Sequence, residues 1–170
     1  MKTLINKILE EARFDIVSPR DKAFIAAFDN AIAGLGYDFG GRIGDGYCWG
    51  PYMIIYAKTG VKAKKVAARI YIREDGIVLR LFFSKIDAHS AFIEQAPLYI
   101  REVFTGPHAD CNFCENKKDG LCSFRKTYTL DGRTISKCSG VAFEFHEPDE
   151  EKLPDYMALL AEFYPPPKRK

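Results

Sequence analysis

Four cysteines in one short segment constrain the fold of this chain more than any other sequence feature. Cys111, Cys114, Cys122 and Cys138 follow the pattern C-x2-C-x7-C-x15-C. The first pair has the two-residue spacer of a metal-binding knuckle, which lets two sulfurs converge on one ion. Thiolates bind zinc at about 2.3 Å, and structural sites take four such ligands in a tetrahedron. The segment 105–140 is therefore predicted to be a cysteine-rich insertion ordered by Zn²⁺.

The same spacings leave alternatives open. An iron–sulfur cluster, a thiol redox switch and unligated cysteines all fit them, although structural zinc is preferred. His108 stands three residues before the first cysteine and could replace one thiolate. Four cysteines fill the coordination shell of zinc and leave no position for water, so the predicted site is structural rather than hydrolytic.

Composition and charge limit the class of protein. The chain has 170 residues, of which 47% are hydrophobic and 28% charged, values typical of a globular fold. The net charge of +2 is too small to indicate a nucleic-acid partner by itself. No apolar run approaches the roughly 20 residues that a membrane helix needs. The charged, amphipathic N-terminal segment lacks the apolar core of a signal peptide, so we expect a cytoplasmic protein with reduced thiols and no membrane partner.

Periodicity predicts a single α+β domain, residues 1–170, with about five antiparallel strands packed against helices and a basic tail at 165–170. Ser18 and Pro19 are typical of a helix start. Ser84 and Asp87 have the spacing of a second helix cap. The predicted helices cover about 2–12, 19–34, 84–95 and 97–104, with a final helix from Pro154; the predicted strands cover about 50–58, 65–74, 77–84, 126–130, 134–136 and 141–145.

Two Asp-Gly pairs predict β-hairpins, because this dipeptide tolerates the positive φ angles of a type I′ turn. Asp131-Gly132 joins the later pair of strands, and Asp75-Gly76 joins the earlier pair. If Asp75-Gly76 forms the turn, Arg73 lies opposite Val78. Alternation then predicts a core face, made of Ala68, Ile70, Ile72, Leu79, Leu81 and Phe83.

The opposite face of the same hairpin is predicted to be basic and aromatic. Guanidinium groups bind carboxylate or phosphate, and aromatic rings hold flat ligands. We expect this face to bind an anionic or aromatic small molecule, or else to be a solvated or covered sheet face; stacking on nucleic acid would look similar locally. Tyr47 and Trp49 are candidate walls of the same site. The face consists of Arg69, Tyr71, Arg73, Arg80 and Phe82, with Tyr52 and Tyr56 on the neighbouring strand.

The remaining candidates favour structure over catalysis. Cys48 is interpreted as a packed thiol, and His89 and His146 as structural or exposed residues. No nucleophile with a base and an orienting partner is apparent, so binding is favoured over enzymatic activity. The alternative function is a zinc-containing module that contacts protein or nucleic acid through basic residues of the cysteine segment. These basic residues are Lys117, Lys118, Arg125 and Lys126. The oligomeric state is not indicated.

Overall fold

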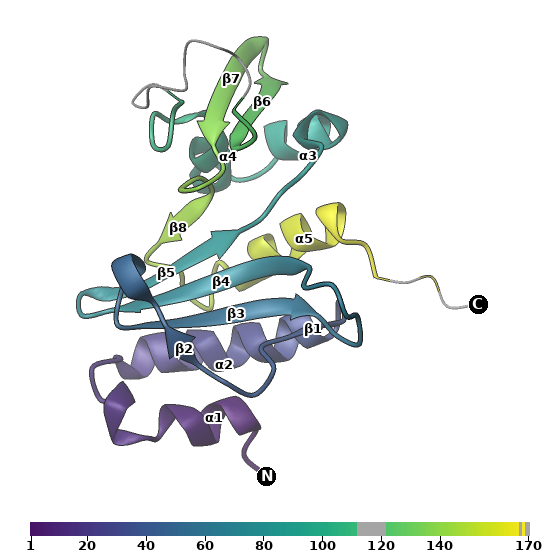
Figure 1. Cartoon of the computed structure of the whole chain (residues 1–170). Coiled ribbons are helices and arrows are strands. Elements are labelled where there is room, and N and C mark those ends of the chain that lie inside the picture. Colours follow the sequence, from purple (N-terminus) through teal and green to yellow (C-terminus); the bar gives the residue numbers. More distant parts are fainter. Residues whose placement is uncertain (112–121, 167, 169–170) are drawn as a thin grey trace. The chain divides into compact units, whose positions relative to one another are not determined.

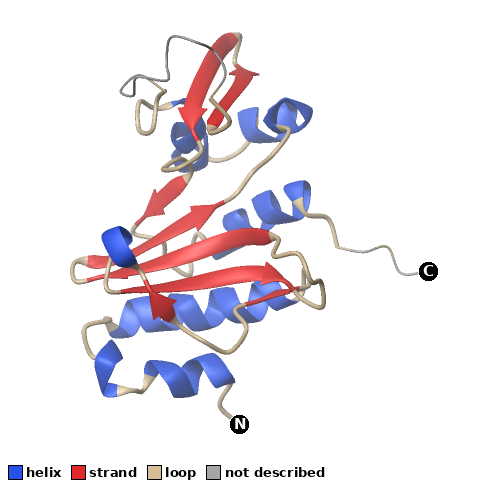
Figure 2. Cartoon of the chain, in the orientation of Figure 1, coloured by secondary structure: helices blue, strands red, loops and turns tan. Residues whose placement is uncertain are grey.

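The computed structural model describes residues 1–111, 122–166 and 168, and these fold into two compact units. The first unit comprises Met1–Phe82 and Phe145–Lys170, and the second comprises Phe83–Glu144. The predicted insertion 105–140 therefore falls inside the second unit. The fold is α+β, as predicted, and the strand pairs within the first unit are antiparallel (Figure 1, Figure 2).

The sheet follows the order β1-β3-β4-β5-β8, and β2 pairs with β3. Its central strands are rich in β-branched and aromatic residues, which favour extended structure. The strands are β1 (Tyr37–Asp38), β2 (Gly44–Asp45), β3 (Tyr52–Lys58), β4 (Val66–Arg73), β5 (Gly76–Leu81) and β8 (Glu144–His146).

One face of the sheet packs against helices, among them α2 (Pro19–Ala33), which runs alongside β3 and β4 in Figure 1. Ser18 caps α2 as predicted, since its Oγ accepts a hydrogen bond from Asp21 N at 3.1 Å. Phe28 of α2 contacts Tyr56 of β3, with ring centroids 5.2 Å apart. The other helices of the first unit are α1 (Leu4–Leu9) and α5 (Leu153–Phe163), with short 3-10 turns η1 (Ala12–Phe14) and η2 (Tyr47–Trp49).

The predicted core face of the β4–β5 hairpin is confirmed, but its predicted register is wrong. Arg73 pairs with Gly76 rather than with Val78, so Glu74-Asp75 forms the turn. Asp75 does not adopt a positive φ, and Gly76 takes φ +138° as the first residue of β5. The predicted pairing differs from the observed one by two residues. The side-chain period of a strand is also two, so the residues of β4 and β5 keep their predicted faces, whereas Phe83 lies beyond the end of β5, in the second unit.

The second unit is built around a cluster of aromatic side chains. Phe83, Phe104 and Phe143 contact one another, each pair with ring centroids 5.2 Å apart. Tyr128 is buried beside them, and its hydroxyl donates to Phe104 O at 2.6 Å. The elements of this unit are η3 (Ile86–His89), α3 (Ser90–Glu94), α4 (Leu98–Thr105), β6 (Arg125–Leu130) and β7 (Arg133–Cys138).

The sequence predicted a hairpin turn and a helix cap in the second unit, and the structure confirms only the turn. The Asp131-Gly132 hairpin is confirmed, with φ angles of 49° and 73° between the paired Leu130 and Arg133. The cap predicted at Ser84 is wrong, because Lys85 takes a left-handed φ of 53° and the helical turn begins after it. Asp87 Oδ1 instead accepts from Thr129 N at 2.8 Å, a tertiary contact that replaces the local one.

Candidate functional sites

Backbone pairing brings three of the four predicted zinc ligands to one end of the β6–β7 hairpin. Cys111 N donates to Ser136 O at 3.0 Å, and Cys138 N donates to Ala109 O at 2.8 Å, so residues 109–111 pair with β7. Arg125 lies directly opposite Cys138 and donates its backbone N–H to Cys122 O at 3.2 Å. The three cysteines therefore belong to one local arrangement.

The thiols of these cysteines are free rather than disulfide-bonded. Arg125 Nε donates to Cys111 Sγ at 3.2 Å. Among the residues that the structure describes, no group of three possible ligands that includes a cysteine has all its ligand atoms within 4.8 Å. Cys114, Lys117 and Lys118 lie outside the described residues. The four-cysteine zinc site accordingly stays a prediction.

The predicted basic-aromatic face of the first unit is an internally bonded cluster. Trp49 stacks on Tyr71 with ring centroids 5.8 Å apart and an interplanar angle of 12°. Arg73 Nε donates to Trp49 O at 2.8 Å, and Arg80 donates to the Tyr71 hydroxyl at 3.0 Å. The Arg69 and Arg80 guanidinium groups lie over the Phe82 ring, 5.1 and 4.7 Å from its centroid.

This cluster corrects two expectations. Arg80 is only 3% exposed and Tyr71 is fully buried, so they do not offer an open anion-binding surface. Tyr52 lies on the other face, because it pairs with the core residue Ile72 and contacts Phe14 at a centroid distance of 5.0 Å. Tyr56 also belongs to the helix-packed face. Alternation can place arginine and aromatic side chains on one sheet face as predicted. Those side chains can still bond and stack with one another instead of binding a ligand.

A pocket of about 480 Å³ lies on the same sheet face as the cluster, farther along β3. Met53, Ile55 and Ala57, alternate residues of β3, line it, and we call it the β3 pocket. Polar and charged side chains from β1, β2, the end of β3 and the adjoining loops form the rest of its wall, together with the 80% exposed Tyr47. The charged lining residues are Arg42, Lys58 and Lys64, with Asp38 and Asp45.

A second pocket, of about 360 Å³, lies where α2 begins and β4 turns into β5. Its charges are mixed, with Arg20 and Arg73 beside Asp21 and Asp75. Arg20 is also held by Asp149 at 3.1 Å. This balance of opposite charges favours no particular ligand class.

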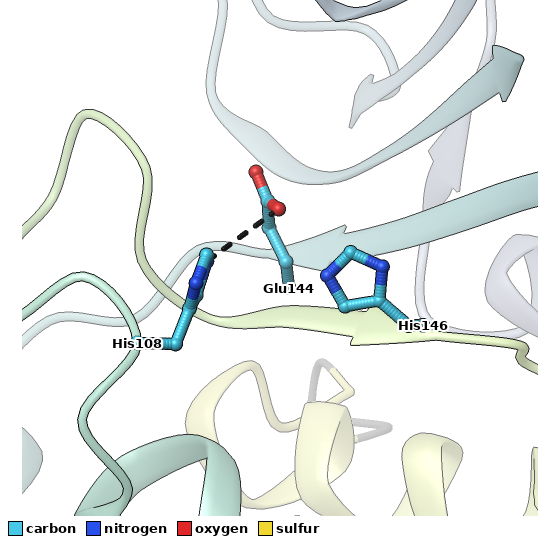
Figure 3. Close-up of side chains that lie close together, drawn as sticks. All are labelled: His108, Glu144 and His146. Carbon is cyan, nitrogen blue, oxygen red and sulfur yellow. Dashed lines mark ion pairs between the residues drawn. The ribbon is translucent and has the colours of Figure 1, made fainter.

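A group of possible metal ligands that sequence reasoning missed gathers at β8 (Figure 3). Within the second unit, His108 Nε2 lies 3.7 Å from Glu144 Oε2. His146 is two residues farther along the same strand, and the ligand atoms of all three residues lie within 4.8 Å of one another. His108 was considered as a replacement for one thiolate, and His146 was interpreted as structural or exposed; the structure shows His146 exposed. The Glu-x-His spacing of Glu144 and His146 was the available signal, because alternate residues of a strand share a face.

Comparison of the chain with protein-family models, curated proteins and solved structures yields no match. Membrane-spanning length and apolarity are found in none of the helices that the structure describes. Function must therefore be argued from the sites themselves.

Proposed function

We propose that this protein binds a small anionic molecule with a flat apolar part in the β3 pocket. The observation that carries the proposal is an apolar strand surface bordered by three cationic side chains. Ligand sites commonly combine an apolar lining with a few polar groups in about 300–1,000 Å³, and the pocket volume of about 480 Å³ lies in that range.

The charges at the pocket support an anion. Arg42, Lys58 and Lys64 outnumber the two carboxylates. One carboxylate, that of Asp38, is already engaged, since it accepts from Gly40 N at 2.9 Å and from the Thr59 hydroxyl at 2.7 Å. Long cationic side chains can close on a carboxylate or phosphate while the ring of the ligand covers Met53, Ile55 and Ala57.

In this proposal the cysteines of the second unit have a structural role. We propose that Cys111, Cys114, Cys122 and Cys138 bind one structural zinc ion. The hydrogen bonds from Cys111 N to Ser136 O and from Cys138 N to Ala109 O support this, because they bring ligands from distant positions in the sequence to one end of a hairpin. Four thiolates would complete the coordination shell of this ion, so it would hold Cys111 and Cys122 beside Cys138 and would not bind substrate.

The ligand proposal is tested by thermal shift against aromatic carboxylates, sulfonates and phosphates, followed by calorimetry on any compound that raises Tm. A ligand that binds only the folded chain raises Tm with concentration. The double variant Arg42→Ala/Lys64→Ala should weaken binding by at least about tenfold, since each charged hydrogen bond contributes roughly 1.5–3 kcal/mol. Ala57→Leu should weaken it further by filling the pocket.

Lys62→Ala is the matched control, because Lys62 is exposed in the same loop but does not line the pocket. It should bind as the unsubstituted chain does. Binding that survives both the double variant and Ala57→Leu would place the ligand elsewhere. A panel in which no compound changes Tm would remove the proposal.

A further inference from the structure

His108, Glu144 and His146 form a ligand set of a kind that proteins use for transition metals. Two imidazoles and one carboxylate suit zinc and its first-row neighbours, whereas calcium and magnesium prefer oxygen ligands alone. The three residues come from two places. His108 lies after α4, and the other two lie on β8.

The observed spacing is close to that of a bound ion. Zinc lies about 2.0–2.2 Å from imidazole nitrogen or carboxylate oxygen, so two ligand atoms on one tetrahedral ion are about 3.3–3.5 Å apart. His108 Nε2 and Glu144 Oε2 are 3.7 Å apart. The remaining distances do not exceed 4.8 Å, which rotations of the exposed His146 ring can close.

Burial differs between the ligands in a way that suits an accessible site. The Glu144 side chain is 7% exposed, whereas the His108 side chain is 62% exposed. The strand backbone and burial hold the carboxylate in place, and the imidazoles reach solvent, from which an ion can enter. Glu144 and His146 share one short strand, so their side chains leave the same face without any loop rearrangement.

We infer that His108, Glu144 and His146 bind a divalent transition-metal ion of the zinc class. This site is separate from the cysteines in residues and in donor chemistry. Three protein ligands leave at least one coordination position on the ion for water or an anionic ligand, unlike four thiolates. The site does not depend on the β3 pocket, and either proposal can fail while the other holds.

The 170-residue chain is purified without added metal or chelator, so that any zinc bound to its thiolates stays in place, and is titrated with Co²⁺ and Zn²⁺ by calorimetry and absorption spectroscopy. We expect one further equivalent of Co²⁺ with weak visible bands and no added thiolate-to-cobalt charge transfer. Loss of a residue that merely orients a ligand already costs about 10–100-fold in metal affinity. Glu144→Gln, His108→Ala and His146→Ala should therefore each weaken this binding by at least about 100-fold.

His89→Ala is the matched control, since His89 is the remaining histidine of the chain and should leave the affinity unchanged. NMR of the unsubstituted chain guards against misfolded variants. Zn²⁺ should shift the ring nitrogens of His108 and His146 but not those of His89. Unshifted His108 and His146 resonances, or variants that keep the affinity of the unsubstituted chain, would overturn the inference.

Discussion

Lys137 shows at the level of a single residue how the second unit is tied together. Its side chain is completely buried, which is rare for lysine without partners. The ammonium group donates to Gly106 O, to His108 O at 2.7 Å and to Asp110 Oδ1 at 2.7 Å. One side chain therefore binds the segment between α4 and the cysteines to β7, and it positions the backbone of His108.

Replacing Lys137 with Met should destabilise the chain by about 3 kcal/mol. The substitution keeps the apolar stem but leaves two backbone carbonyls and the partly exposed Asp110 carboxylate without their donor, so the loss lies at the lower end of the about 3–5 kcal/mol that a buried charged pair costs when one partner is removed. Urea unfolding measures the effect. Lys126→Met, across the hairpin from Lys137, is the control and should cost much less. Equal losses for both variants would contradict this role of Lys137.

Asp29 is a second residue whose environment has a measurable consequence. Burial raises the pKa of its carboxyl group, and the nearby Asp38 carboxylate raises it further. Folding therefore favours the protonated form. The stabilisation from this group is complete below the pKa of the unfolded chain and is lost as pH rises through the higher pKa of the folded chain.

Asp29→Asn should therefore stabilise the chain at pH 7, because an amide carries no charge to bury. The gain should shrink as pH falls towards the ordinary aspartate pKa of 3.8. Urea unfolding of both proteins between pH 3 and 7 gives the difference directly. The exposed Asp15→Asn serves as the comparison and should show a much smaller change. A variant less stable than the unsubstituted chain at pH 7 would refute the argument.

At the level of elements, α2 shows that residues at a helix start can predict where the helix begins. Its first residue is proline and its preceding residue is a serine cap, and both were expected from the sequence. The β4–β5 hairpin shows where such local prediction fails, because its register differs from the predicted one. Alternation identified its faces correctly, but the dipeptide rule placed the turn one residue too late, because cross-strand packing sets the register when the turn does not require positive φ.

Ser18→Ala should lower the free energy of unfolding by about 1 kcal/mol through loss of the α2 cap. The hydroxyl accepts from Asp21 N at 3.1 Å. Thr3→Ala, at the exposed start of the shorter α1, removes a longer contact of 3.4 Å and should cost less. Thermal and urea unfolding check the order of the two effects. A neutral Ser18→Ala would show that tertiary packing alone determines the start of α2.

At the level of the whole molecule, the chain folds into two compact units. The core of the first is the sheet against its helices, and that of the second is the cluster around Phe104. The cysteines lie in the second unit, as does Lys137. Any metal that the cysteines bind should therefore affect that unit directly. The β3 pocket lies in the first unit and the cysteines lie in the second, so a perturbation of either can be followed separately.

Removal of metal should loosen the second unit selectively if the cysteines bind zinc. Because metal binding contributes to folding free energy, a strong chelator should speed amide hydrogen exchange in β6 and β7 and leave β3 and β4 protected. Elemental analysis should show loss of about one zinc per chain, and Cys138→Ser should reproduce the exchange pattern without chelator. Chelated protein with unchanged exchange in β6 and β7 would show that the cysteines do not order this hairpin.

The sequence by itself determined the features that depend on neighbouring residues. The α+β class, the capped helix after Ser18, the Asp131-Gly132 turn and the core face of β4–β5 all follow from local conformational preferences and from side-chain periodicity. The physical reason is that a few consecutive residues decide whether a cap, a turn or an alternating pattern can form.

Only the tertiary structure decided which side chains meet. It buried Arg80 against Tyr71 and Phe82, placed Tyr52 among core residues, and opened a pocket on β3 instead. It also brought His108 to Glu144, residues far apart in the sequence. Periodicity assigns a residue to a face but does not specify what covers that face, since this depends on the long-range pairing of strands and loops.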